Sequence, residues 1–248
     1  MQQRKDEWFG KQSNIEYHER QFKTTYRSTV AFCDFLEEIG YLHKDSKLMI
    51  MDLASGAGAN ISYMGKRYPQ STFIGVDFNP DLVMLGNKFF KDNKIDNCHL
   101  EVGDIYKLDE KYVSVFDGIV SLQTLSWLPE FQEPIDSMAS LKAKWISLSS
   151  LFFDGHVSAT IDLRTHDKSL EPAKDCFYNI YSLPVVERYL SEKGYAEYQL
   201  SPFEIDIDLP EPDVKAMGTY TVKLENGSRL QKSGPLLMPW YFIAARKQ

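Results

Sequence analysis

Residues 48–60 read Leu-Met-Ile-Met-Asp-Leu-Ala-Ser-Gly-Ala-Gly-Ala-Asn, an apolar run followed at once by a glycine-rich turn. An unbroken apolar run of this length is typical of a strand that is covered on both faces, as in a parallel sheet. Gly56 and Gly58 allow the backbone to turn sharply and to lie against a ligand, although a tight strand-to-helix turn also uses glycine for structural reasons alone. The stretch predicts a buried strand, a loop suited to a nucleotide-like ligand, and the start of a helix.

Strand-length apolar segments alternate with helical ones along most of the chain. Further strands are predicted at 71–76, 98–102, 115–122 and 144–151, and helices up to residue 68, from Pro80, over 134–141 and over 182–195. Such alternation is typical of right-handed βαβ units. We therefore predict a doubly wound α/β fold with a seven-stranded, mostly parallel sheet.

The two ends of the chain carry additional elements. Apolar residues recur at helical spacing over 26–39, which predicts an N-terminal helical cap within residues 1–45. Residues 203–209 alternate apolar and acidic side chains, which predicts a half-buried strand, and Asn226-Gly227 predicts a hairpin inserted around 214–238. Residues 240–245 read as a last strand. We expect one structural domain overall, with residues 46–248 forming its main part.

Charge and composition argue against several classes of protein. Lys and Arg number 28 and Asp and Glu 35, a net charge of −7 that is unsuited to gripping nucleic acid. We find no long apolar run and no signal-peptide core, so we expect a cytoplasmic protein without a membrane span. Cys33, Cys98 and Cys176 lie far apart with no ligand-like spacing, so we expect neither a disulfide nor a metal site.

An acidic residue ends each of the first three predicted strands. These residues are Asp52, Asp77 and Asp104. Because the carboxyl ends of parallel strands meet at one edge, where ligands of open α/β sheets bind, we expect the three carboxylates to line one crevice. Each could instead cap a helix or occupy a solvated turn.

These motifs resemble those of the class I S-adenosylmethionine-dependent methyltransferases over roughly residues 48–151. Their first motif runs acid-x-Gly-x-Gly-x-Gly, and this chain has Asp52, then Ala54 at the first glycine, then Gly56 and Gly58. The resemblance implies a Rossmann-like methyltransferase fold, S-adenosylmethionine as cofactor and S-adenosylhomocysteine as product. It also implies that Gly56 and Gly58 approach the methionine portion, with the methyl group of Ala54 beside it.

The same resemblance assigns roles to the next two motifs. Asp77 would accept hydrogen bonds from the ribose hydroxyls, and Phe78 would pack on the adenine. Asp104 would accept from the exocyclic amine, with Ile105 next to it in the cofactor site. Phe78 could equally be an ordinary core aromatic residue.

The loop after the fourth strand limits which classes of methyl acceptor fit the sequence. Amino-group nucleic-acid methyltransferases carry an acid or Asn followed by Pro-Pro-aromatic here, whereas this chain has Ser121-Leu122-Gln123-Thr124. Methylation of a base is therefore disfavoured, and the absence of acids in the loop implies no magnesium. Gln123, Thr124 and Trp127 are candidates for the cofactor and acceptor wall, although Trp127 could simply pack in the core.

Two further stretches are candidates for the acceptor side. Residues 1–27 carry six basic and four acidic residues, and Tyr17, Arg20 and Gln21 share a helix face. This cap suits an anionic small molecule or the cofactor carboxylate, for which we name Tyr17 and Arg27; a solvated amphipathic helix is the alternative.

The second stretch follows the fifth strand and contains His156, Arg164 and His166, then a long connection with Tyr178, Asn179 and Tyr181. Long connections are often binding loops. Either histidine could remove a hydroxyl proton, and Arg164 could hold an anion, so these three are the catalytic candidates. A histidine in a surface turn is the alternative for each.

The resulting hypothesis is methyl transfer to a small polar acceptor, either a hydroxyl or an anionic oxygen of a phosphate or phosphoramidate, by a monomer or homodimer. Residues 17–21 and 233–242 are similar to bacterial methyltransferases encoded with capsule or surface-glycan biosynthesis. Two alternatives remain. A non-catalytic S-adenosylmethionine-binding partner protein would carry the same motifs. An NAD-dependent Rossmann oxidoreductase would place Ile61 at the third glycine of its fingerprint.

Overall fold

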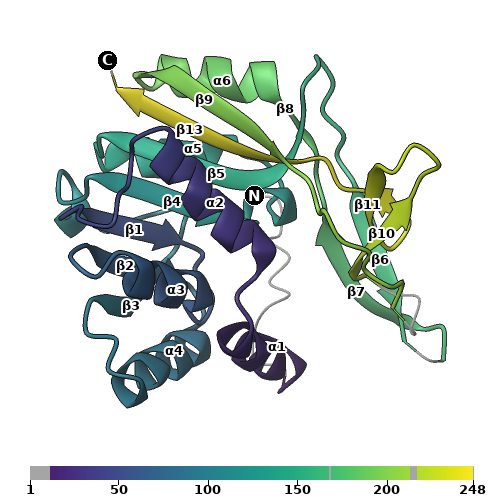
Figure 1. Cartoon of the computed structure of the whole chain (residues 1–248), viewed down its shortest axis with the longest axis horizontal. Helices are drawn as coiled ribbons and strands as arrows, with labels where there is room; N and C mark the ends of the chain where they lie inside the picture. Colours follow the sequence, from purple (N-terminus) through teal and green to yellow (C-terminus); the bar gives the residue numbers. More distant parts are fainter. Residues whose placement is uncertain (1–11, 168, 213–216, 248) are drawn as a thin grey trace.

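A twisted sheet forms the centre of the computed structural model, which describes residues 12–167, 169–212 and 217–247 (Figure 1). Its spatial order is β3 (Cys98–Val102), β2 (Thr72–Asp77), β1 (Met49–Leu53), β4 (Gly118–Leu122), β5 (Trp145–Phe153), β13 (Trp240–Lys247) and β9 (Tyr195–Phe203). The first five strands are parallel, and β13 runs antiparallel to both of its neighbours. The predicted seven-stranded, mostly parallel sheet is confirmed, and the short β8 (Tyr181–Ser182) additionally pairs with β5.

Helices cover both faces of the sheet. One face carries α5 (Gln132–Ser140) and α6 (Leu183–Glu192), and the other carries α2 (Arg27–Glu38), α3 (Ala59–Arg67) and α4 (Pro80–Asp92). Successive residues of β1 alternate between them, with Met51 packing in the first core and Ile50 in the second. This is the doubly wound arrangement that the continuous apolar strands predict.

Local sequence explains where these helices begin and end. The Asn79 side chain caps α4 by accepting from the backbone N–H groups of Asp81 and Leu82, and Pro80 fixes the first turn. The predicted helix over 26–39 is confirmed as α2, whose periodic apolar residues are buried and which Gly40 follows with a φ of 75°. Two single-turn 3₁₀ helices, Glu110–Tyr112 and Leu125–Trp127, complete the connections.

A second body of strands, which we call the arm, stands beside the carboxyl edge of the sheet (Figure 1). It consists of β6 (Asp162–His166), β7 (Pro172–Phe177), β10 (Thr219–Lys223), β11 (Arg229–Ser233) and β12 (Leu236–Leu237). The hairpin predicted at Asn226-Gly227 is confirmed between β10 and β11, with Gly227 at a φ of 86°. The division of the chain into a cap and a main part remains a prediction.

The strand predicted over residues 203–209 is wrong in its bounds. β9 ends at Phe203, and residues 204–209 form no ladder, although their apolar side chains still point inward. One backbone bond, from Thr221 N–H to Leu209 O at 3.1 Å, joins this segment to the arm, and side chains supply the others: Gln231 Oε1 accepts from Ile205 N–H at 2.7 Å, and Thr221 Oγ1 accepts from Leu209 N–H at 2.8 Å. The alternation of apolar and acidic residues therefore predicted correctly which side chains are more buried, but it did not predict whether the segment pairs as a strand.

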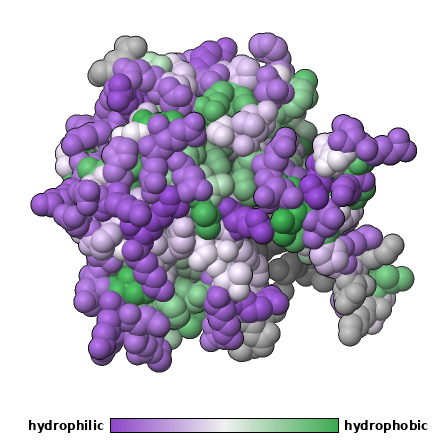
Figure 2. Space-filling model, viewed as in Figure 1, coloured by the Kyte–Doolittle hydropathy of each residue, from purple (hydrophilic) through white to green (hydrophobic). Residues whose placement is uncertain are grey.

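Polar residues cover most of the face shown in Figure 2, and apolar ones show through in scattered patches. Within the described ranges, no helix combines the length and the apolar character needed to cross a membrane.

Candidate active site

The carboxyl ends of β1, β2, β4 and β5 lie along one edge because these strands are parallel to one another. Helix α1 (Gln12–Lys23), the first turn of α2 and the arm border the same edge (Figure 1). Ligands of open α/β sheets bind at such an edge, so this is the place to look for a site.

The β1–α3 loop follows a backbone path that favours glycine. Ala54, Gly56 and Gly58 all have positive φ, of 55°, 56° and 79°. A Cβ on Gly58 would lie 2.8 Å from the Phe90 ring, so this glycine lets α4 pack against the loop. A Cβ on Gly56 would instead lie 2.6 Å from the His18 imidazole, so Gly56 turns its open side toward α1.

Asp77, at the end of β2, holds the loop in place. Its buried carboxylate accepts from Gly56 N–H at 2.7 Å and from Asn79 N–H at 3.0 Å. Burial raises the pKa of Asp77 above its ordinary value, and the two backbone hydrogen bonds act in the opposite direction. Asp77 is thus an acceptor fixed at the edge of the sheet.

Asp52 is the least satisfied polar group of the edge. It is 1% exposed, and neither carboxyl oxygen has a hydrogen-bond partner among the described residues. Burial, followed by the charge of Asp77, raises its pKa well above the usual range. A buried carboxyl group without a partner is costly, so this position suits a ligand that brings hydrogen-bond donors or positive charge.

The third strand end is shaped as a turn. Asp104 Oδ1 accepts from Tyr106 N–H at 2.9 Å, which is the turn interpretation left open above. Ile105 packs at the margin of one core, and Phe78 is half-buried. Their roles toward adenine stay predictions.

Gln123 ties the loop after β4 to the start of α2. Its φ is 58°, its N–H donates to Ser149 O at 2.7 Å, and its Nε2 donates to Ser28 Oγ at 2.7 Å. Left-handed backbone at a non-glycine residue often marks a functional loop. The Trp127 ring packs on Tyr178 with centroids 4.5 Å apart, in agreement with its packing interpretation.

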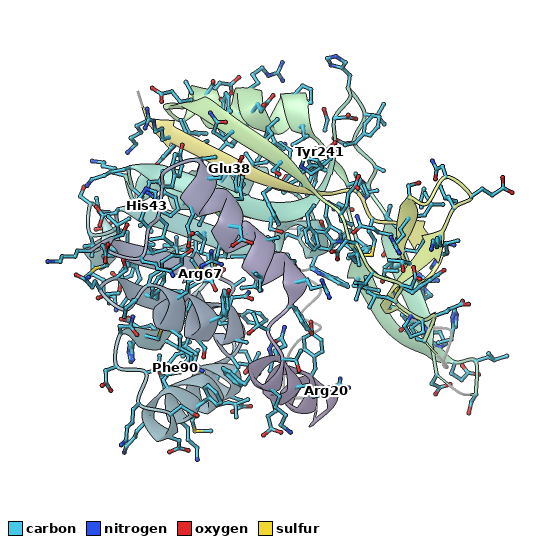
Figure 3. The ribbon with its side chains drawn as sticks, in the orientation of Figure 1. Arg20, Glu38, His43, Arg67, Phe90 and Tyr241 are labelled. Carbon is cyan, nitrogen blue, oxygen red and sulfur yellow. The ribbon has the colours of Figure 1, made fainter. Side chains whose placement is uncertain are left out.

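The basic, aromatic cap is only partly directed at the edge. Tyr17 is half-buried and hydrogen-bonded to Tyr26, and burial raises its pKa. Arg20 is exposed on α1 (Figure 3). Arg27, predicted to hold a cofactor or acceptor anion, forms an exposed ion pair of 3.1 Å with Asp206, so its charge is already matched.

The structure does not gather the predicted catalytic residues into one cluster. His156 is exposed in the loop after β5, and Arg164 and His166 are exposed on β6. The long connection expected to bind ligand forms β6 and β7 and then a buried anchor: Asn179 is fully buried and donates to Leu128 O at 2.9 Å.

Sequence reasoning missed His18. Its imidazole lies on the β1–α3 loop at Gly56, and burial lowers its pKa. The other four histidines, His43, His99, His156 and His166, are all exposed. The spacing of His18 and Phe22, four residues apart on one helix face, is the signal that could have identified it.

No metal is suggested by this geometry, since the described part of the chain contains no group of three or more His, Cys, Asp or Glu placed to hold one. The fully buried Ile61 packs in α3 where an NAD fingerprint requires glycine.

Comparisons with known proteins identify the family and the fold of the chain. A family model described as a methyltransferase domain matches residues 44–195, more than half of the chain. An uncharacterised protein of Rickettsia prowazekii is 37% identical over 87 residues, which is 35% of this chain and about a third (34%) of that relative.

Two solved structures share the fold. A SAM-dependent methyltransferase from Aquifex aeolicus superposes with a TM-score of 0.53 at 13% identity, covering 93% of this chain and 98% of its own. TehB from Haemophilus influenzae gives a TM-score of 0.54 at 17% identity, and the superposition covers 94% of this chain and 66% of TehB.

Proposed function

This chain belongs to the methyltransferase domain family, and from that premise we propose that it transfers a methyl group from S-adenosylmethionine to a small polar acceptor. When bound, the cofactor supplies an electrophilic methyl group on a sulfonium. The chain's own task is to bind the cofactor and to hold the acceptor in line with that methyl group, because displacement at carbon depends mainly on positioning.

The observation that carries the proposal is the unpartnered carboxyl group of Asp52 beside Asp77 and the glycine loop. S-adenosylmethionine brings an ammonium and two ribose hydroxyls, which are the donors that buried carboxylates need. Asp77 is the residue for the ribose hydroxyls, and Asp52 for the amino-acid end.

The acceptor is assigned to the space bordered by α1, the loop of Gln123 and the arm. We propose a hydroxyl, phosphate or phosphoramidate oxygen, such as that of a sugar precursor in capsular polysaccharide synthesis. A hydroxyl would need a base, for which His156 and His166 are the candidates. An anionic oxygen would need cations, for which Arg20, Arg27 and Arg164 are the candidates.

Calorimetry with S-adenosylmethionine, S-adenosylhomocysteine and NADH tests the cofactor. We expect both adenosyl ligands to bind and NADH to give no heat. Binding of NADH alone would overturn the proposal. A methyl-transfer screen on nucleotide-linked sugars and phosphates then separates an enzyme from a non-catalytic binding protein.

The pair Arg27 and Asp206 tests the charge of the acceptor. If the acceptor is anionic, Arg27→Gln and Arg164→Gln raise its KM, Asp206→Asn lowers KM by releasing Arg27, and cofactor affinity stays unchanged. If it is a hydroxyl, His156→Gln or His166→Gln lowers kcat by about 10²–10⁴ and flattens the pH profile. Unchanged rates in all five variants would place the acceptor elsewhere.

A further inference from the structure

Helix α1 is fixed across the cofactor loop by one of its faces. His18 and Phe22 lie one turn apart on that face. The Phe22 ring stacks on Phe89 of α4 with centroids 3.8 Å apart, and α1 also contacts α3. The stack fixes the position of the helix, in which the His18 side chain contacts Gly56.

The His18 imidazole lies against the β1–α3 loop at Gly56. Its Cε1 and Nδ1 lie 2.6 and 3.0 Å from the position that a Gly56 Cβ would take. The Tyr17 ring stands edge-on to it at 5.2 Å, and Gln21 hydrogen-bonds to it. A ligand group bound next to this side of Gly56 would therefore lie beside the imidazole.

Two different kinds of ionisable group lie near Gly56, one on the sheet and one on α1. The sheet side supplies the carboxyl groups of Asp52 and Asp77, which match donors and positive charge. The α1 side supplies an imidazole, whose pKa burial lowers and the hydrogen bond with Gln21 raises. A carboxylate placed beside it would favour the protonated ring, which donates from both nitrogens, to Gln21 and to the carboxylate. An amino-acid group carries one ammonium and one carboxylate, so the two sides match its two ends.

We propose that His18 is a positioning residue that donates a hydrogen bond to the carboxylate at the amino-acid end of the cofactor. This inference rests on the proposed function, because it requires S-adenosylmethionine at the glycine loop. It goes beyond that function in assigning part of cofactor recognition to a helix that lies outside the matched family region, residues 44–195.

Three ligands separate this role from a merely structural one. S-adenosylhomocysteine has the whole amino-acid end, its decarboxylated analogue lacks only the carboxylate, and methylthioadenosine lacks the entire end. We expect His18→Ala to weaken S-adenosylhomocysteine by about 10- to 100-fold, as for a lost hydrogen bond to a charged group, and to leave the other two within about twofold. His18→Asn should recover part of the loss because its amide also donates.

His43→Ala is the matched control, because His43 is exposed in the turn after α2, away from α1 (Figure 3). It should leave all three affinities unchanged. Equal losses for all three ligands in His18→Ala, with an unchanged melting temperature, would reduce His18 to packing, and no loss for any would remove it from the site. A wild-type chain that binds none of the ligands would contradict the proposed function itself.

Discussion

The sheet and the arm are both built of strands, but they are held in different ways. In the sheet, backbone ladders pair buried strands and glycines give room for packing: a Cβ on Gly86 would overlap the carbonyl oxygen of Ala57. The arm also has ladders, but it is joined to residues 204–209 largely through the side chains of Gln231 and Thr221, and Gly227 has open space around it. This contrast accords with the two proposed roles, a rigid cofactor site at the sheet edge and an acceptor surface bordered by the arm.

The largest effect should come from Asp77→Ala. Losing charge-assisted hydrogen bonds to two ribose hydroxyls should weaken S-adenosylhomocysteine binding by about 1.5–3 kcal/mol, measured by calorimetry. Because Asp77 also accepts from Gly56 N–H, part of this loss comes from the loop.

An aspartate-to-alanine change next to the arm is the control. Asp208 forms an exposed ion pair with Arg229, so Asp208→Ala should leave cofactor affinity unchanged and cost at most about 0.5 kcal/mol of stability. Unchanged affinity in Asp77→Ala, with cooperative melting preserved, would remove Asp77 from the site and break the contrast.

Glycine-to-alanine changes compare packing in the two regions directly. Gly86→Ala should lower the free energy of unfolding by about 2–3 kcal/mol because α4 must move off the loop. Gly227→Ala should cost about 1 kcal/mol, from its positive φ alone. Urea denaturation gives both values, and equal costs would show that the loop yields as readily as the hairpin.

The pH dependence of stability should come from the sheet edge. The pKa of Asp52 is raised in the folded chain, so the folded chain holds this proton more tightly than the unfolded chain. The resulting contribution to the free energy of unfolding is fully present below the ordinary aspartate pKa and is lost as pH rises through the raised value. The cofactor-free chain should lose up to about 1.4 kcal/mol per pH unit in that window.

Asp52→Asn should reduce this slope in urea denaturation measured across pH, leaving the part that comes from the raised pKa of Asp77. Bound S-adenosylhomocysteine should also reduce the slope, since donors at Asp52 favour the charged form. An unchanged slope in Asp52→Asn would assign the titration to another group.

The smallest effect concerns Ala54, whose left-handed φ of 55° strains an alanine. Ala54→Gly should raise stability by a few tenths of a kcal/mol, roughly the strain relieved less the extra entropy that glycine loses on folding. A melting temperature that falls would mean that the Ala54 methyl packs usefully.

The sequence predicted the sheet side well because its signals are local. The apolar run ending at Asp52 needed only burial on both faces to be recognised, and Asn79-Pro80 marks the start of a helix by its own chemistry. The hairpin of the arm was also predicted, from Asn226-Gly227, but the segment that leads into the arm was not, because its hydrogen bonds depend on distant partners. Residues 204–209 look like a strand, yet their hydrogen bonds go to Thr221 and Gln231.

The site divides in the same way. The strand-end acids could be named from their positions alone. The spacing of His18 and Phe22 shows only that the two share a helix face, and the stack of Phe22 on Phe89 sets where that face crosses the loop. Arg27 was interpreted as an anion ligand because Asp206, 179 residues later, could not be seen as its partner.

The position of β13 sets an order of assembly. It lies between β5 and β9 in the sheet, although it follows β9 in the chain by the whole length of β10 to β12. During synthesis, α6 follows directly on β8, which pairs with β5, whereas β9 is made before the strand that joins it to β5. β9 therefore has no partner in the sheet until β13 has been translated, and the last two places in the sheet are filled together.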